Sequence, residues 1–306
     1  MEGLEHKSRR DCAKVFAEFD KHDRRDVMAQ LCFERIAQKQ EFIAEILHQT
    51  NDWNHTAYFM LMRGLDIRRN RKAYEYLSNI LPYRYIYAER KDLAFVEAML
   101  LGCAGLLHRL VDATNHHPEV VERYKIFEYN AHKYGLEQMR IDDWELSQLR
   151  SENHPIIRLL QVAKILKEYD HLLDTLLSCR TPKDVERIFC LGEAPKWAQR
   201  LLGVQGGTGA MTRNKAHLLG VNVVAQMQIL YSEYTMREDL DSRGLELLEQ
   251  LPAEKNTYIN RWNGFGVAAE NALESQALLQ LYTNYCMNAK CDNCPLMVFA
   301  DARCRG

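Results

Sequence analysis

Residues 92–107 have the sequence DLAFVEAMLLGCAGLL. After the aspartate, apolar side chains stand at almost every position, so a helix formed here has almost no polar face. A helix that is apolar all round usually lies at the centre of a core. Asp92 is a residue type that caps helix N-termini, and Gly102 and Gly105 permit close helix approach. The segment therefore predicts a central buried helix with other helices packed around it.

Helical patterns also dominate the rest of the chain, and strand signals are almost absent. Apolar residues between Asp23 and His48 fit a helix with a polar back, and Asp52 offers a cap for the next helix. Pro118 and Pro155 suit first helical turns. Helices joined by short loops predict an all-α, multi-helix, bundle-like array. Later helices are expected over residues 216–234, 239–250, 254–262 and 269–285.

The glycine-rich segment GVQGGTGA (residues 203–210) is the clearest break in the chain. Glycine-rich segments are loops by default, and a boundary between two subdomains is expected there. We expect one helical region over residues 1–202 and a second over residues 211–285, packed on the first or continuous with it. Residues 286–306 form a cysteine-rich tail.

Length and composition limit the class of protein. The 306 residues suffice for one large core or two ordinary domains. With 47% hydrophobic residues and a mean hydropathy of −0.40, a soluble globular protein without a membrane partner is expected. The formal charge of −2 gives no global attraction to nucleic acid. The start of the chain lacks the apolar centre of a signal peptide, and the scattered remaining cysteines favour a reducing cytoplasm.

Four cysteines, Cys286, Cys291, Cys294 and Cys304, lie within the last 21 residues. Two cysteines separated by two residues can turn both sulfurs toward one ion, and further thiols can complete a tetrahedral site. Zinc and a [4Fe–4S] cluster both suit such thiolates, and zinc also accepts a histidine in place of Cys304. The alternative is a set of surface thiols near a frayed end that bind no metal. The spacing favours a metal site that fastens the tail.

The segment of residues 63–91 combines a local excess of positive charge with five tyrosines. Cations for phosphates and aromatic rings for bases are what single-stranded nucleic-acid binding uses. The alternative is a solvated helix face whose tyrosines pack inward. The cations expected to contact nucleic acid are Arg68, Arg69, Arg71, Lys72 and Arg84.

Several stretches resemble the bacterial domain-of-unknown-function family 2851. The strongest is LLEQLPAEKNTYINRWNGFGVAAENALESQALLQLYTNYCMNAKCDNC (residues 247–294), which shares with the family a Ser-Gln-Ala-Leu-Leu-Gln-Leu run and Tyr-Cys-x4-Cys-x2-Cys. Residues 92–107 and HKYGL (132–136) also match. A further match is SENHPIIRLLQVA (151–163), at Asn153, Pro155, Arg158 and Gln161.

The resemblance implies that the chain corresponds to the helical C-terminal region of a larger two-part protein. The N-terminal half of that protein is similar to restriction-endonuclease-like folds, so a nuclease-like site of the family would lie outside these residues. The resemblance therefore implies an accessory helical region, whose partner is a nuclease-like half or a separate protein. It carries over no activity.

The cysteine loop is also similar to the iron–sulfur loop of the endonuclease III class of DNA glycosylases. LLGVQGGTGAM (residues 201–211) is similar to the helix-hairpin-helix turn that grips a DNA phosphate. The likeness fails in two details. The glycines are one residue out of register, and no aspartate follows until Asp239, so the catalytic carboxylate of that class is missing.

The sequence assigns no catalytic residue. Arg158 lies inside an apolar helix, and a buried arginine would need a carboxylate partner. We expect a non-catalytic helical module that binds nucleic acid or docks beside a nuclease-like partner, with a metal site at its C-terminus. The alternatives are a protein–protein scaffold without metal and an iron–sulfur-dependent DNA-processing enzyme. The enzyme would need a pocket lined by Glu270, Arg158 or His154.

Overall fold

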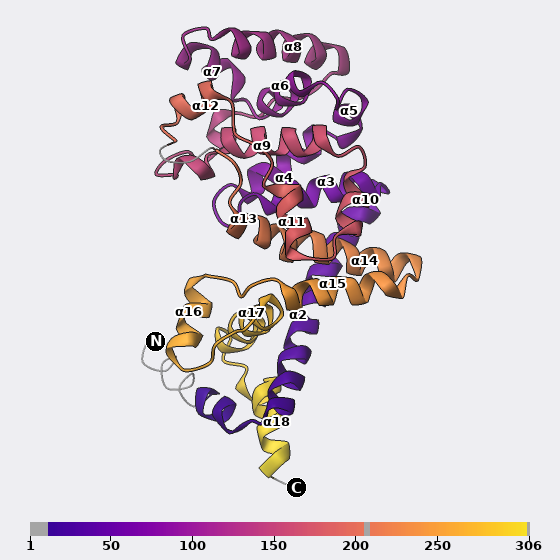
Figure 1. Cartoon of the computed structure of the whole chain (residues 1–306), viewed down its shortest axis with the longest axis vertical. Helices are drawn as coiled ribbons and strands as arrows, with labels where there is room; N and C mark the ends of the chain where they lie inside the picture. The colour runs from indigo at the N-terminus through magenta and orange to yellow at the C-terminus, as the bar shows by residue number, and fades with distance from the viewer. Residues whose placement is uncertain (1–11, 205–208, 305–306) are drawn as a thin grey trace. The chain divides into compact units, whose positions relative to one another are not determined.

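Helices make up nearly all the regular structure of the chain (Figure 1). The computed structural model describes residues 12–204 and 209–304, with every side chain in these ranges except those of Glu238, Asp301, Arg303 and Cys304. These residues form no strand and only one isolated antiparallel bridge, between Pro252 and Asn271. The all-α prediction is therefore confirmed.

The chain folds into two compact units. Among the described residues, unit 1 contains those up to Glu45, then Arg180–Pro182 and those from Gln228 onward. Unit 2 contains Ile46–Cys179 and Lys183–Met227. Two of the boundaries fall inside helices, α2 (Lys21–Thr50) and α14 (Ala225–Thr235). The glycine-rich segment, where a boundary was expected, lies within unit 2, and its residues 205–208 are outside the described part.

The core of unit 2 is built around α6 (Leu93–Cys103), which is the helix expected from residues 92–107. Every residue from Phe95 to Cys103 is buried. The helix α6 packs between α8 (Pro118–Tyr134) and α9 (Pro155–Glu168) (Figure 1). Asp92 caps the helix by accepting hydrogen bonds from the N–H groups of Ala94 and Phe95 at 2.9 and 3.3 Å. A Cβ atom on Gly102 would lie 2.1 Å from the ring of Phe127. Glycine is therefore what allows α6 and α8 this close approach.

One ion pair is buried in this core. Glu97 is 1% exposed, and its carboxylate accepts a hydrogen bond from Nε of Arg123 at 2.7 Å. Burial raises the pKa of Glu97, while the nearby Arg123 opposes the rise. A buried charge is tolerated only with such a partner, so the single polar residue of the apolar segment links α6 to α8.

The other helices of unit 2 follow the caps and prolines of the sequence. α8 and α9 both begin at a proline, and α8 ends at Gly135, whose φ of 60° is the left-handed conformation that glycine adopts easily. The remaining bounds are α3 Trp53–Gly64, α4 Arg71–Ile80, α5 Tyr83–Ala88, α7 Leu107–Ala113, α8 Pro118–Tyr134, α9 Pro155–Glu168, α10 Leu172–Ser178, α11 Pro182–Phe189, α12 Lys196–Leu201, α13 Arg213–Leu219 and the π-helix η3 Gly220–Val224, with short 3₁₀ turns η1 Ile141–Asp143 and η2 Ser151–Asn153.

No single helix in the described ranges is long and apolar enough to cross a membrane. The helices α6 and α7 pass that test only as a pair, and the pair is bent by 104°.

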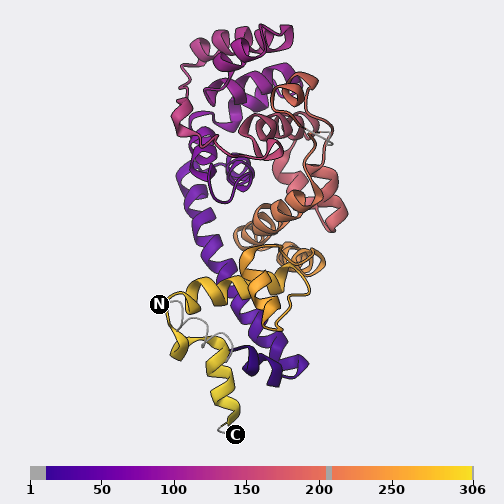
Figure 2. The same ribbon diagram turned by 90° about the vertical axis from the view of Figure 1, so that its left-hand side faces the viewer.

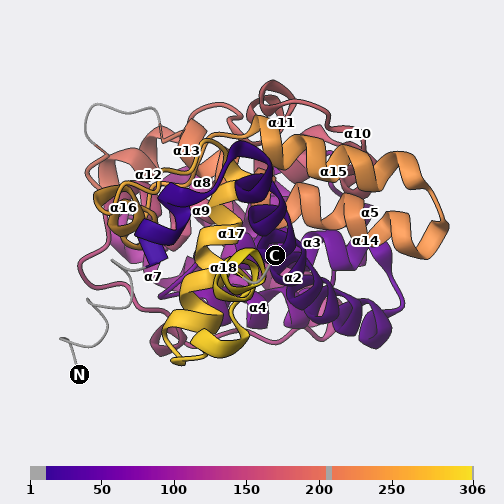
Figure 3. The same ribbon diagram turned by 90° about the horizontal axis from the view of Figure 1, so that it is seen from below.

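Unit 1 combines the N-terminal part of α2 with helices from the C-terminal region (Figures 2 and 3). Its elements include α15 (Glu238–Gln250), α16 (Thr257–Gly264), α17 (Ala272–Gln280), the π-helix η4 (Leu281–Cys286), the 3₁₀ turn η5 (Cys291–Asn293) and α18 (Pro295–Cys304). Aromatic rings join the two ends of the chain. Phe16 meets Trp262 edge-on at 6.3 Å, and Phe19 lies 5.4 Å from Phe299, measured between ring centroids.

Two helices of unit 1 begin later than their apolar pattern indicates. The helix α16 begins at Thr257 rather than at residue 254. The reason is that the side chain of Asn256 accepts hydrogen bonds from the backbone N–H groups of Tyr258 and Ile259. α17 begins at Ala272 rather than at 269, because Asn271 accepts one from the N–H of Glu274. Asparagine is a strong N-terminal cap. The cap residue thus decides where the helix begins, not the first apolar residue.

Candidate functional site

The cysteines of residues 286–294 lie where three successive helical elements of unit 1 begin or end. Cys286 ends η4, Cys291 begins η5, and Cys294 directly precedes α18. Cys291 is exposed and Cys286 half-buried, whereas Cys294 is 3% exposed. Burial raises the pKa of Cys294, and the neighbouring Cys291 adds to the rise. The backbone N–H groups of Met297 and Leu296 act on the same sulfur and lower its pKa.

The geometry of the described residues does not assemble a metal site. Within residues 12–204 and 209–304, no group of three or more His, Cys, Asp or Glu side chains is placed to hold a metal ion. The side chain of Cys304 lies outside what the structure describes. The backbone of Cys304 ends the ten-residue helix α18. At 1.5 Å per residue, the helix places Cys304 roughly 15 Å along its axis from Cys294.

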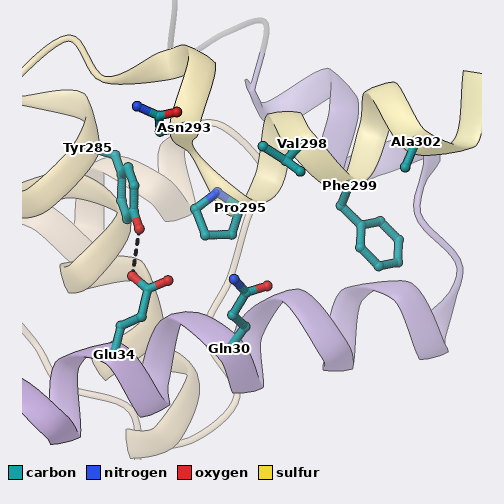
Figure 4. A pocket seen from close by; sticks show the side chains of 8 residues that line it. All are labelled: Gln30, Glu34, Tyr285, Asn293, Pro295, Val298, Phe299 and Ala302. Carbon is teal, nitrogen blue, oxygen red and sulfur yellow. Dashed lines mark hydrogen bonds between the residues drawn. The ribbon is translucent and has the colours of Figure 1, made fainter.

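A pocket of about 230 Å³ adjoins this segment (Figure 4). Gln30 and Glu34 of α2 line one side, and Pro295 and Phe299 of α18 line the other. Tyr285 donates a hydrogen bond to the Glu34 carboxylate at 2.7 Å. Burial and this carboxylate together raise the pKa of Tyr285, so the phenol stays protonated. The hydrogen bond fastens the chain just before the cysteines to α2.

A polar network inside unit 1 uses residues of the family-like stretch. Gln276 is 2% exposed, and its side-chain oxygen accepts hydrogen bonds from Arg35 at 2.8 Å and Lys39 at 2.5 Å. Its amide N–H donates to the carboxylate of Glu254, and Ser275 accepts a hydrogen bond from the Glu254 backbone N–H at 2.9 Å. These contacts satisfy buried polar groups. The network therefore explains Ser275 and Gln276 of the Ser-Gln-Ala-Leu-Leu-Gln-Leu run as structural residues.

The basic segment of residues 63–91 lies wholly in unit 2, on the loop between α3 and α4 and on α4 and α5. Arg68, Lys72 and Arg84 are exposed, and no ion pair joins any of them to another described residue. Arg69 is also exposed, but it pairs with Glu145 at 3.4 Å. Arg71 is half-buried. Three of the five predicted contact residues are thus available to solvent and unpaired.

The tyrosines of this segment divide between core and surface. Tyr74 and Tyr83 are 1% and 3% exposed, and they pack against Trp144 and Tyr58. Only Tyr76 is substantially exposed, at 44%. The guanidinium of Arg84 lies over the ring of Tyr85, 5.0 Å from its centroid. Most of the aromatic surface expected for base stacking is therefore used within the protein.

Arg158 is buried, as its place in an apolar helix predicts, at 4% exposure. Its partners are amides, not the expected carboxylate. It donates to Gln161 at 2.9 Å and to Asn153 at 2.7 Å, and Gln161 in turn donates to the carbonyl of Gly209 at 2.8 Å. These are three of the four residues that match the family pattern in 151–163. The sequence expectation of a carboxylate partner was wrong, because amide oxygens accept the hydrogen bonds of the two terminal guanidinium nitrogens.

Two further cations, Lys215 and Arg71, lie near Arg158. Lys215 of α13 donates to the carbonyl of Gly64 at 2.7 Å. The pKa of Lys215 is lowered to about 7, mainly by burial and also by the positive charges of Arg158 and Arg71, against the opposing effect of Asp66. Nothing in the local sequence around Lys215 distinguishes it from an ordinary helix residue. The sequence therefore did not indicate that it joins Arg158.

The residues proposed for an enzyme pocket belong to different units. His154 caps α9, where its Nδ1 accepts a hydrogen bond from the N–H of Ile156 at 3.3 Å, and it belongs to unit 2 with Arg158. Glu270 belongs to unit 1 and is exposed, and its backbone N–H donates to Glu274 at 3.0 Å. Glu274 pairs with Arg24 at 3.4 Å. These contacts are those of helix starts.

Comparison with known proteins gives a family and no activity. No curated protein and no solved structure matches the chain. Residues 2–257 match the family described as protein of unknown function (DUF2851). The matched residues include α6, the Arg158 contacts and the basic segment, and they end before the cysteines. Because the match covers most of its length, the chain belongs to the DUF2851 family.

Proposed function

We propose that the chain is a non-catalytic helical module that binds single-stranded nucleic acid through the basic segment of unit 2. The observation that carries the proposal is the group of exposed, unpaired cations Arg68, Lys72 and Arg84. Lys and Arg side chains that neutralise phosphates release counterions, so each contact adds affinity that falls with salt. The exposed Tyr76 offers one ring for stacking on a base.

The net charge of −2 makes this a local effect, so charge reversal at these positions is a sharp test. Arg68→Glu, Lys72→Glu and Arg84→Glu together are expected to abolish binding of a fluorescent single-stranded oligonucleotide at low salt. The control is Lys183→Glu, Lys196→Glu and Arg200→Glu, which makes the same charge change at exposed positions of α11 and α12.

Binding equally weakened by both triple variants would mean that only total charge matters. Binding unchanged in the basic-segment variant, or absent in the unaltered protein, would refute the proposal. A slope of log affinity against log salt that is smaller in the variant than in the unaltered chain would support it.

The second part of the proposal is a metal site, zinc or a [4Fe–4S] cluster, held by Cys286, Cys291 and Cys294 with Cys304 as fourth ligand. Its support is the spacing of the thiols and the two backbone N–H groups that act on the Cys294 sulfur. Thiolate ligands are commonly stabilised by such groups. As a helix, α18 keeps Cys304 away, so a four-thiol site requires its last turns to unwind when metal binds.

Elemental analysis of protein purified without oxygen tests this part. A brown protein containing iron indicates a cluster, and a colourless protein with one zinc indicates a structural clamp. Cys291→Ser is expected to lose the metal, and Cys190→Ser in unit 2 is the matched control. Cys304→Ser decides the fourth ligand. A protein that binds neither metal under these conditions would refute the site.

A further inference from the structure

Unit 2 contains a cluster of buried hydrogen-bond donors that have no acceptor. Nε of Arg158, Nε of Arg71 and the hydroxyl of Tyr74 are all inaccessible to solvent, and none has a hydrogen-bond partner among the described residues. Tyr74 is 1% exposed and Arg158 is 4% exposed. A buried donor left without an acceptor costs free energy. Three such donors on neighbouring side chains therefore indicate that a hydrogen-bond acceptor binds among them.

The charges of the cluster also favour a bound anion. Arg71, Arg158 and Lys215 are three cations, and no ion pair joins any of them to a carboxylate of the described residues. Asp66 acts on the cluster, but its own oxygens accept the backbone N–H groups of Arg68, Arg69 and Asn70. Like charges repel one another, and this repulsion contributes to the lowered pKa of Lys215. A bound anion would stabilise the charged form of the cluster.

The cluster is also held in a fixed geometry. Asn153 and Gln161 orient the guanidinium of Arg158, and the carbonyl of Gly64 orients the ammonium of Lys215. The four elements that supply the cluster and its supports, α3, α4, α9 and α13, lie together within unit 2 (Figure 1). Side chains whose rotamers are fixed by other hydrogen bonds are preorganised for a ligand.

We propose that Arg71, Tyr74, Arg158 and Lys215 form an internal binding site for a phosphate group. A tetrahedral oxyanion accepts several hydrogen bonds at once from guanidinium, ammonium and hydroxyl donors. It would satisfy the three unpartnered donors and neutralise the cations together. No carboxylate of the described residues forms an ion pair with Arg71, Arg158 or Lys215. The site goes beyond the proposed nucleic-acid surface. Arg71 and Tyr74 lie in the basic segment, but neither is among the exposed cations Arg68, Lys72 and Arg84 that carry the proposed function.

Two sources of the phosphate group are distinguishable, free inorganic phosphate and the terminal phosphate of an oligonucleotide. Calorimetric titration with inorganic phosphate, against chloride at equal ionic strength, measures the first. Titration with a 5′-phosphorylated oligonucleotide and with the same oligonucleotide lacking that phosphate measures the second. A preference for the phosphorylated strand, lost in variants of the cluster, assigns the site to a nucleic-acid end.

Tyr74→Phe removes one donor with almost no change in volume. It is expected to weaken phosphate binding about tenfold, as for one hydrogen bond to a charged ligand. Tyr58→Phe is the matched control, because the Tyr58 hydroxyl is also buried in unit 2 without a partner but is not among the four site residues. Lys215→Met is expected to abolish binding while the protein remains folded.

Equal phosphate affinity in the unaltered chain, Tyr74→Phe and Lys215→Met would overturn the site, as would the absence of phosphate binding to the unaltered chain. Oligonucleotide binding that is unchanged in the triple variant of Arg68, Lys72 and Arg84, with phosphate binding present, would refute the proposed function and leave this site standing. Oligonucleotide binding that is lost in the triple variant, with no phosphate binding to the unaltered chain, would refute the site alone.

Discussion

Replacing Lys215 by methionine should stabilise the protein in the absence of an anion, and the gain should depend on pH. The pKa of Lys215 is lowered from 10.5 to about 7 in the folded chain. At about 1.4 kcal/mol per unit, the lowered pKa corresponds to a cost of roughly 5 kcal/mol when the side chain is charged. The lost hydrogen bond to Gly64 takes back about 1 kcal/mol. We expect Lys215→Met to be more stable by up to about 4 kcal/mol at pH 7.

The sign of the pH dependence follows from proton binding. Because the pKa of Lys215 is lower in the folded chain, the unfolded chain binds more protons between pH 7 and 10.5. The stability of the unaltered protein therefore rises with pH across this window, relative to the variant. The cost is fully present below pH 7 and is gone above pH 10.5.

Urea unfolding between pH 6.5 and 9.5 measures the difference in free energy of unfolding. It should shrink by up to about 1.4 kcal/mol for each pH unit above 7. Lys183→Met removes an exposed lysine of the same unit and serves as the control. A difference that is the same at every pH, or a variant less stable than the unaltered chain at pH 7, would refute the reasoning.

Three other outcomes follow from the contacts described above. Gly102→Ala forces a methyl group against Phe127 and should lower the free energy of unfolding by about 1–3 kcal/mol, whereas Gly264→Ala, which meets nothing within 4 Å, should not; chemical denaturation distinguishes them. Glu97→Ala removes the one buried carboxylate that Arg123 pairs with and leaves it the exposed Glu119 and Glu122, which should cost about 3–5 kcal/mol, most of it recovered when Arg123→Met is added; a cost unchanged by the second substitution would count against the pair. Removing a bound metal with a chelator should lower the melting temperature of the protein, and an unchanged melting curve would mean that no metal supports the fold.

Much of the fold could be predicted from local sequence. The segment 92–107 indicates a central helix because its apolar residues leave no face for solvent, and α6 is buried accordingly. Asp52, Asp92 and the helix-starting prolines mark their helices, because capping and first-turn geometry depend on adjacent residues. Where an asparagine competed with an apolar pattern, as at Asn256, the cap decided the boundary.

The candidate sites were less predictable, since they depend on contacts between distant residues. Burial of Arg158 follows from its apolar helix, but its amide partners and the approach of Lys215 come from packing that no local pattern records. The division of the chain into two units could not be predicted from local sequence either. A glycine-rich loop is a local signal of a break, but the boundaries at 45 and 227 fall inside continuous helices.

The composition of unit 1 has a consequence for biosynthesis. Its residues up to Glu45 are made before unit 2, yet most of the rest of unit 1 begins only at Gln228. During translation, all of unit 2 leaves the ribosome while the buried residues Val27, Leu31 and Ile43 of the nascent chain still lack their cover. Chains interrupted in this interval expose an apolar helix face, and such surfaces recruit chaperones or aggregate. Unit 1 can therefore finish folding only after the ribosome has translated the residues from Gln228 onward.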